Sequence, residues 1–334
     1  MRKATLNLLL VLGATLTILV VIEALLTVFF PLHLTGDPQW YRYDAELGVR
    51  LRDGLHAFRT TDHQQEMKTN GLGTVNFQES FSDYRMLVFA LGDSYTQGTG
   101  LPSDVSYPAQ LDLKLNLAAS AYVKQYGVVN LGLAAYGLEQ EILSLERYRK
   151  LLGNPAYILF LGCDNDFEDD ELFLAGYRHK HVVLDNPAYG KWLTLLQWAG
   201  NREIGKRAKL LIGLIARRKS VGDTGNGALT APALPVAALE EKRLNHLLGL
   251  ARSINAILIV SWANVEQDGN GGSYAALKQW AGANNVRFAD WYPAVASVEQ
   301  AVAWPLWNRH SGGHYRTWVN GLIADAMARE ITRK

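Results

Sequence analysis

The chain has little cysteine and little net charge, and each shortage excludes a class of protein. Its 334 residues include one cysteine, and 33 Lys and Arg residues offset 32 Asp and Glu residues to leave a formal charge of +1. Because Cys163 is alone, no intrachain disulfide forms and no cysteine cluster binds zinc or iron. The balanced charge offers no basic stripe for nucleic acid. With 49% hydrophobic and 19% charged residues and no internal repeat, the chain is globular, and its function must lie in local sites.

The N-terminus carries a long apolar run. Thr5 to Phe30 is almost wholly apolar and follows Arg2 and Lys3. As a helix this run spans roughly 39 Å, more than the ~30 Å hydrocarbon core, whereas the apolar part of a cleavable signal has about 7–15 residues. Residues 1–31 are therefore predicted to be a cytoplasmic N-terminus and an uncleaved transmembrane anchor. Because the basic residues precede the run, the rest of the chain is expected in the periplasm or outside the cell.

Glu23 interrupts this apolar run. An ionisable side chain costs about 2.5–3.5 kcal/mol at the centre of a membrane helix and less toward an end. Two interpretations are open. Glu23 contacts a helix of a membrane-protein partner, or it lies near the outer interface with its carboxyl protonated or hydrated.

Apolar runs alternate with helix-like segments from Met86 onward. Residues 32–84 show little periodicity and are interpreted as a connector that packs on the domain and carries no obvious chemistry. The runs "MLVFAL", "GVVNLG", "YILFLG", "AILIVSW" and "VRFAD" read as strands, and helices are expected over 107–119, 138–152, 237–255, 273–284 and 316–331. This alternation predicts an α/β protein, a three-layer α/β/α sandwich with a mainly parallel central sheet, over residues 85–334.

The alternation breaks at about 167–235, which is interpreted as an inserted helical segment. A possible hairpin, "HVVLD", precedes two amphipathic helices, at 191–200 and 202–220. The second helix has an apolar face and a basic end. It could lie on a membrane surface, cover a pocket as a lid, or pack on the domain in the ordinary way.

Polar residues follow three of the predicted strands, in "LGDS", "NLGLAAYG" and "LGCDNDFEDD". The carboxyl ends of parallel strands open on one edge of a sheet, where the sites of such folds collect. Ser94, at the first of these ends, is either part of a helix-capping turn or a nucleophile. A nucleophilic serine needs a base for its proton and hydrogen-bond donors for the developing oxyanion.

On these motifs the chain resembles the SGNH, or GDSL, hydrolase superfamily, which has a flavodoxin-like fold. The resemblance implies that Ser94 of "GDS" is the nucleophile. The second block, Asn-x-x-x-x-Gly, begins at Asn130 and has Ala135 in place of its glycine. The third block implies Asn165. The backbone N–H groups of Ser94 and Ala135 and the side-chain amide of Asn165 would form the oxyanion hole.

The fourth block departs most from the family pattern, in "WNRHSGGHYRTWVNG". His314 fits best as the catalytic base, and His310 is the alternative. Ser311 stands where the family has an aspartate, so the site is either a Ser-His dyad or one in which a backbone carbonyl or a distant acid replaces the aspartate. No metal site is expected, because the acidic residues after the third strand are interpreted as a solvated loop: Asp164, Asp166, Glu168, Asp169 and Asp170.

Together these features predict a membrane-anchored serine esterase or O-acyltransferase. The expected substrate is an ester-bearing small molecule, lipid or polysaccharide of the cell envelope, and no cofactor and no nucleic acid is implied. The alternative is a catalytically inactive binding or scaffold subunit of an envelope polysaccharide assembly, an interpretation that the missing aspartate and Ala135 favour.

Overall fold

The centre of the molecule is a five-stranded parallel sheet. The computed structural model describes residues 2–32, 40–59, 65–117, 125–176, 187, 191–220, 238–264, 272–302 and 314–333. The strands are β5 (Met86–Gly92), β6 (Tyr126–Asn130), β7 (Tyr157–Gly162), β8 (Ile257–Trp262) and β9 (Arg287–Phe288). They lie in the order β6-β5-β7-β8-β9, every neighbouring pair parallel. The predicted parallel sheet is confirmed, and the β5 strand that precedes Ser94 lies between β6 and β7.

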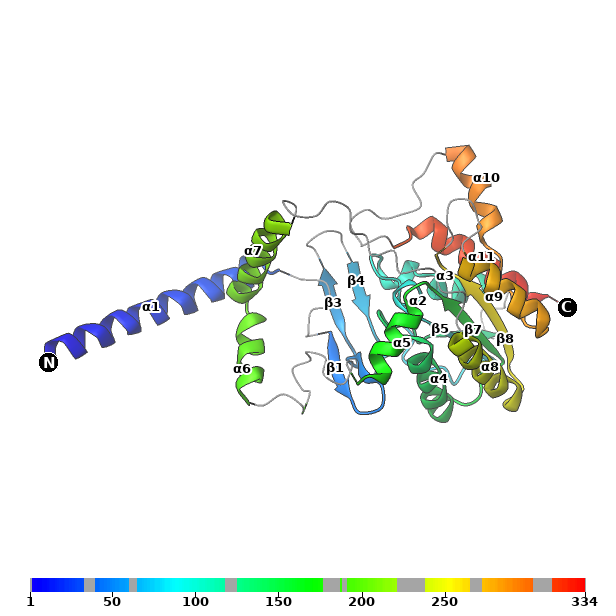
Figure 1. Ribbon diagram of the computed structural model, residues 1–334, viewed down its shortest axis with the longest axis horizontal. Coiled ribbons are helices and arrows are strands. Elements are labelled where there is room, and N and C mark those ends of the chain that lie inside the picture. Colours follow the sequence, from blue (N-terminus) through cyan, green and yellow to red (C-terminus); the bar gives the residue numbers. More distant parts are fainter. Residues whose placement is uncertain are drawn as a thin grey trace.

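Both faces of the sheet are covered, so the predicted three-layer α/β/α sandwich is confirmed (Figure 1). Alternate side chains of β5 enter two separate cores, because successive residues of a strand point to opposite faces. Val88 and Ala90 pack with α3 (Tyr107–Asn116) and α11 (Thr317–Thr332). Phe89 and Leu91 pack with α4 (Leu138–Leu152), α8 (Ala238–Ser253) and α9 (Gly272–Ala283). These five helices begin and end close to the bounds that the sequence predicts.

Four short strands before the sheet were not predicted. β1 (Tyr41–Asp44) and β2 (Gly48–Leu51) form one antiparallel hairpin, and β3 (His56–Arg59) and β4 (Gln65–Lys68) form another. Their apolar side chains share a third core with Leu133 and Tyr136, which follow β6. The Tyr136 hydroxyl donates to the Val49 carbonyl oxygen at 2.6 Å. The hairpins therefore support the loop that carries Ala135.

The remaining described elements are helical. They are α2 (Ser94–Gln97), the 3₁₀ turn Ser103–Val105, α5 (Asp166–Leu174), α6 (Lys191–Gly200), α7 (Glu203–Ser220) and α10 (Tyr292–Val302). α6 and α7 match the two predicted amphipathic helices, whereas the possible hairpin at 181–185 lies outside the described residues.

A single helix, α1 (Arg2–Phe29), projects from the domain at the N-terminus (Figure 1). Within it, Lys3–Phe29 is long and apolar enough to cross a membrane, and within the described residues it is the one helix with this property. In the most apolar part of this helix, no residue is buried against the rest of the described chain. α1 is therefore a candidate membrane span, and it is confirmed as a helix over the predicted run.

Candidate active site

Strand β5 delivers Ser94 to the carboxyl edge of the sheet, where it begins the one-turn helix α2. Asp93 caps this turn, because its Oδ1 accepts the Tyr95 N–H at 2.9 Å. Gly92 has a φ of +147°, and a Cβ at this position would lie 2.1 Å from Thr96 Oγ1 and 2.8 Å from the Leu161 carbonyl oxygen. Only glycine allows the chain to turn this sharply between strand and serine.

The structure brings His314 to Ser94. His314 Nε2 lies 2.8 Å from Ser94 Oγ, although the two residues are 220 positions apart in the sequence. The imidazole lies on the ring of Tyr95, with 5.0 Å between ring centroids. The next residue, Tyr315, is buried, and its hydroxyl donates to the Ala263 carbonyl oxygen after β8. The other candidate base, His310, and Ser311 lie outside the described residues.

The Ser94 hydroxyl has a second polar neighbour. It donates to Asp93 Oδ2 at 2.8 Å, while His314 Nε2 lies at the same distance from Oγ. A hydroxyl has one proton, so it donates to one of these acceptors at a time. When Ser94 donates to Asp93, the hydrogen between Ser94 and His314 belongs to Nε2. For His314 to act as a base, the hydroxyl proton must turn from Asp93 toward the imidazole.

Ala135 occupies the left-handed region of backbone conformation, with a φ of +63°. A non-glycine residue rarely adopts this region, which accounts for the glycine expected at this position. The preceding loop lies against β5 and α2: the Leu133 N–H donates to the Gly92 carbonyl oxygen at 3.2 Å, and the Ala134 N–H donates to Gln97 Oε1 at 2.7 Å. The path of the loop past α2 therefore fixes the backbone of Ala135.

Asn130 holds this loop from within the core rather than at the rim. Its side chain is buried, its Oδ1 accepts the Gly132 N–H at 3.0 Å, and its Nδ2 donates to the Thr96 carbonyl oxygen at 3.0 Å. A Cβ on Gly132 would lie 2.4 Å from the Gln97 nitrogen. Through these two hydrogen bonds, the Asn130 side chain joins the loop after β6 to α2, the helix that carries Ser94.

Asn165 follows β7, the strand next to β5, and is exposed at the start of α5. Its Nδ2 donates to Asp169 Oδ2 at 2.7 Å, and its Oδ1 accepts the Cys163 thiol at 2.9 Å. An amide nitrogen carries two hydrogens. The bond to Asp169 therefore orients the amide and leaves one N–H to donate elsewhere.

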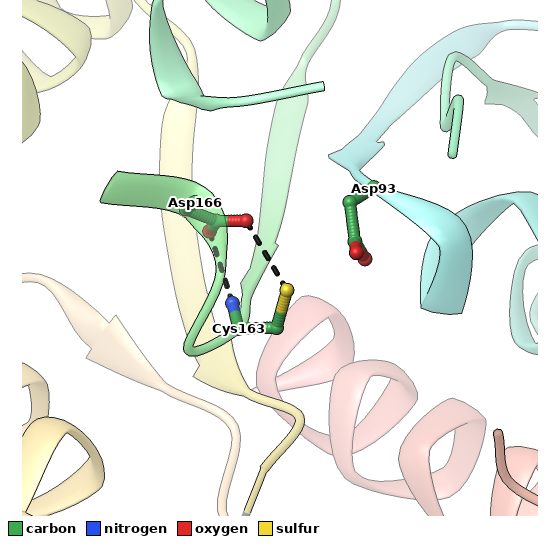
Figure 2. Close-up of side chains that lie close together, drawn as sticks. All are labelled: Asp93, Cys163 and Asp166. Atoms are coloured by element: carbon green, nitrogen blue, oxygen red, sulfur yellow. Dashed lines mark hydrogen bonds between the residues drawn. The ribbon is translucent and has the colours of Figure 1, made fainter. Parts of the chain in front are cut away.

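Beneath the serine lies a buried acidic group, defined as Asp93, Cys163 and Asp166 (Figure 2). Their ligand-type atoms lie within 4.8 Å of one another, and among the described residues they are the one such group that could hold a metal ion. Asp166 accepts the Cys163 N–H at 2.9 Å, and its Oδ1 lies 3.2 Å from the thiol sulfur as an alternative to Asn165 Oδ1 for the one thiol proton. Burial and the neighbouring carboxylates raise the pKa of Cys163 well above its ordinary value, which favours the protonated thiol.

The expected solvated acidic loop is only partly present. Asp164 and Glu168 are exposed, but Asp166, Asp169 and Asp170 are buried. Their burial has a structural reason: α5 turns these side chains inward, where Asp170 Oδ1 accepts the Glu139 N–H at 2.9 Å and Oδ2 lies 3.2 Å from Arg243 Nε. For these three residues the expectation was wrong.

The helix-capping turn considered from sequence is present at Asp93, but sequence reasoning missed the bond of Asp93 to the Ser94 hydroxyl and the supporting side chains of Tyr95 and Asn264. Asn264 joins two strand ends, because its Nδ2 donates to the Tyr95 hydroxyl at 3.2 Å and its Oδ1 accepts the Asp164 N–H at 3.1 Å. The positions of Asp93 and Tyr95 beside Ser94 were a signal for both. Asn264 follows a predicted strand at the same edge of the sheet, which was the one signal for it.

Comparisons with known proteins find similarity to solved structures alone, at low sequence identity. No protein-family model and no curated protein matches the chain. Among solved structures, a lipolytic protein of the G-D-S-L family from Veillonella parvula is 12% identical, covers 75% of this chain and 100% of its own, and has a TM-score of 0.42. A psychrotrophic esterase from Pseudoalteromonas is 13% identical over 74% and 97%, with a TM-score of 0.43.

A third similar structure is an acetylxylan esterase from Geobacillus stearothermophilus, 14% identical over 75% of this chain and 96% of its own, with a TM-score of 0.40. Such distant likenesses say nothing of the activity of this chain. With its parallel sheet flanked by helices, its Gly-Asp-Ser at the end of β5 and, among the described residues, one candidate membrane helix at the N-terminus, the chain resembles the SGNH, or GDSL, hydrolase superfamily.

Proposed function

We propose that the protein is a serine esterase or O-acyltransferase of the SGNH type, with Ser94 as nucleophile and His314 as base. The observation that carries this proposal is the 2.8 Å separation of His314 Nε2 and Ser94 Oγ, within reach for direct proton transfer. A serine is a weak nucleophile until such a base takes its proton. His310 is the alternative base.

In the proposed mechanism, the Ser94 hydroxyl proton turns from Asp93 to His314 as Oγ attacks an ester carbonyl. The N–H groups of Ser94 and Ala135 and the free N–H of the Asn165 amide stabilise the oxyanion. Loss of one such donor typically costs about 2.7–4 kcal/mol. His314 then gives its proton to the leaving alcohol. Water releases the acid from the acyl-enzyme in an esterase, and a second hydroxyl accepts the acyl group in a transferase.

The location of the substrate follows from the anchor. We propose that α1 spans the membrane with Arg2 and Lys3 in the cytoplasm and the domain in the periplasm or outside, since basic residues favour the cytoplasmic side. The corresponding division of the chain is residues 1–31 as anchor, 32–84 as a connector and 85–334 as the catalytic domain with an insertion at about 167–235. A tethered enzyme of this kind would act on esters of the cell envelope.

A fluorophosphonate probe tests the nucleophile, because it labels a serine only where the site activates it. We expect the full-length protein in detergent to be labelled and Ser94→Ala not to be. Ser80→Ala, which changes an exposed serine, is the matched control and should label like the wild type. Absence of labelling in the wild type would refute the esterase and favour the inactive binding subunit.

Hydrolysis of p-nitrophenyl acetate tests the base. His314→Ala should lower the rate by about 10²–10⁴-fold, the usual contribution of a general base. His56→Ala, which changes an exposed histidine of β3, should leave the rate unchanged. If His310→Ala abolishes turnover and His314→Ala does not, the two histidines exchange roles.

A further inference from the structure

Helices α6 and α7 follow one another beside the C-terminal end of α1, outside the α/β/α sandwich (Figure 1). They meet at their junction, where a Cβ on Gly205 would lie 2.3 Å from the Ala199 carbonyl oxygen. In Figure 1 they run across the direction of α1 rather than along it. We refer to residues 191–220 as the α6–α7 segment.

The carboxylate of Glu23 binds the α6–α7 segment to α1 through two hydrogen bonds. Its Oε1 accepts the Glu203 N–H at 2.8 Å, and its Oε2 accepts the Ile204 N–H at 3.0 Å. These N–H groups belong to the first turn of α7, where a helix has no internal acceptors for them and favours a negative charge. Glu23 and the start of α7 thus satisfy each other, which explains an acidic residue in an apolar helix.

A second set of bonds holds the chain just after α1. The Leu32 N–H donates to Glu203 Oε2 at 2.9 Å, and the Arg207 guanidinium donates to the Phe30 carbonyl oxygen. Glu203 is buried and also pairs with Lys206 at 3.0 Å. The attachment therefore involves both the last turns of α1 and the residues that leave it.

The attachment to α1 fixes the position of the α6–α7 segment along the axis of α1. Glu23 precedes the end of α1 at Phe29 by six residues, which corresponds to about 9 Å along the helix axis. The span Lys3–Phe29 has 27 residues, or roughly 40 Å, and exceeds the ~30 Å hydrocarbon core by about 10 Å. When α1 spans a membrane, Glu23 and the start of α7 lie near one boundary of the hydrocarbon.

The α6–α7 segment, in which α7 begins near this hydrocarbon boundary, exposes large apolar side chains. They are Leu195, Leu196 and Trp198 of α6 and Leu210, Leu211 and Ile212 of α7, all between 43% and 66% exposed. The sequence of α7 also holds six basic residues and one acidic residue. An apolar face with a basic composition is typical of helices that lie in a membrane interface, where the apolar face enters by about 5–10 Å.

We propose that the α6–α7 segment, bound to α1 through Glu23, lies in the outer interface of the membrane that α1 spans and inserts its exposed leucines and Trp198 among the acyl chains. The partner is a bilayer that contains anionic lipid. The proposal rests on α1 as a membrane span and not on the esterase chemistry. Such a support would hold the domain at a set distance from the membrane, whereas α1 alone would leave it free to turn.

The test measures the membrane depth of spin labels on the full-length protein in vesicles of phosphatidylcholine and phosphatidylglycerol. Labels are placed singly by Leu196→Cys and Leu211→Cys, with Leu151→Cys of α4 as matched control, since Leu211 and Leu151 are 59% and 61% exposed. Leu12→Cys reports on α1. The native Cys163 is buried and should take up no label, which the unsubstituted protein checks.

We expect the labels at residues 196 and 211 to be accessible to oxygen and shielded from a water-soluble nickel complex, and the label at 151 to show the reverse. If residues 196 and 211 are exposed to nickel while residue 12 is in lipid, the anchor stands and the proposal is overturned. Shielding of residues 196 and 211 from both reagents would indicate a protein contact, with a second copy or the domain, and would also overturn it. Exposure of residue 12 to nickel would refute the anchor itself.

Glu23→Ala tests whether the bonds of Glu23 to the first turn of α7 hold the α6–α7 segment in place. The label at residue 211 should lose its shielding from nickel, while the label at residue 12 remains in lipid. Thr27→Ala is the control, because its hydroxyl bonds only within α1 in the described structure, to the Glu23 carbonyl oxygen. An unchanged label at residue 211 in Glu23→Ala would overturn the role assigned to Glu23. None of these variants changes a residue of the proposed catalytic site, so esterase activity is an independent measurement.

Discussion

Replacing Glu141 with glutamine should make the protein more stable at neutral pH. Glu141 lies on α4 with its side chain 1% exposed, and neither carboxylate oxygen has a hydrogen-bond partner among the described residues. Burial, together with the charges of Asp166 and Asp93, raises its pKa well above the ordinary value of 4.5. The folded protein therefore holds the proton of this carboxyl to a higher pH than the unfolded chain does.

The sign of the pH dependence follows from proton binding. Since the folded state holds a proton that the unfolded state has lost, the stability contributed by this group is present below pH 4.5 and is lost as the pH rises toward the folded pKa. While the folded carboxyl keeps its proton and the unfolded one has lost it, each pH unit costs up to about 1.36 kcal/mol. Glutamine has no such proton to lose.

The assay compares melting temperatures of wild-type and Glu141→Gln protein, followed by tryptophan fluorescence in detergent at two pH values. The advantage of the variant should grow from pH 5 to pH 7.5, by at most about 1.36 kcal/mol for each pH unit, or roughly 1–2 °C per unit for a chain of this size. Any constant difference in hydrogen bonding cancels in this comparison. Glu146→Gln, at a partly exposed position of the same helix, should show no such growth. Parallel curves for wild type and Glu141→Gln would refute a raised pKa of Glu141.

Three further predictions concern Gly132, Ala135 and the Cys163 thiol near Ser94. Gly132→Ala should destabilise the protein by several kcal/mol, since its Cβ would meet the Gln97 nitrogen, whereas Gly249→Ala in open space on α8 should stabilise it by about 0.5–1 kcal/mol, both measured by melting. Ala135→Val should lose ester hydrolysis and Ala135→Gly should keep it, because of the positive φ. Cys163 should react with a maleimide only after unfolding, as its raised pKa and burial imply.

The sheet was predictable from sequence because its strands are buried on both faces. A short apolar run such as "MLVFAL", followed by turn residues and alternating with helix-like segments, is typical of a strand buried in a parallel sheet. The hairpins β1–β4 were not, since four-residue strands that are only partly buried give too short an alternation to detect. Their order in the chain gave no hint that they support the Ala135 loop.

The candidate site was predictable in its parts more than in its contacts. The residues at strand ends could be placed at one edge from the parallel order alone, but the approach of His314 to Ser94 depends on how α11 begins, 220 residues later. Glu23 shows the same limit. From sequence, Glu23 was expected either to contact a partner helix or to lie near the outer interface. Neither interpretation included its bonds to the first turn of α7, because these join segments 180 residues apart.

The docking of the first two hairpins on the loop after β6 has a practical consequence for shortening the protein. A version starting at Met86 would retain every strand of the central sheet, yet it would lose Val49, the acceptor for Tyr136, and the apolar side chains that cover Leu133. The loop that carries Ala135 would then keep its bonds to β5 and α2 but lose the packing that supports it from the other side. Any soluble fragment intended for ligand work should accordingly begin upstream of Trp40, even though the part it adds contains none of the reactive groups.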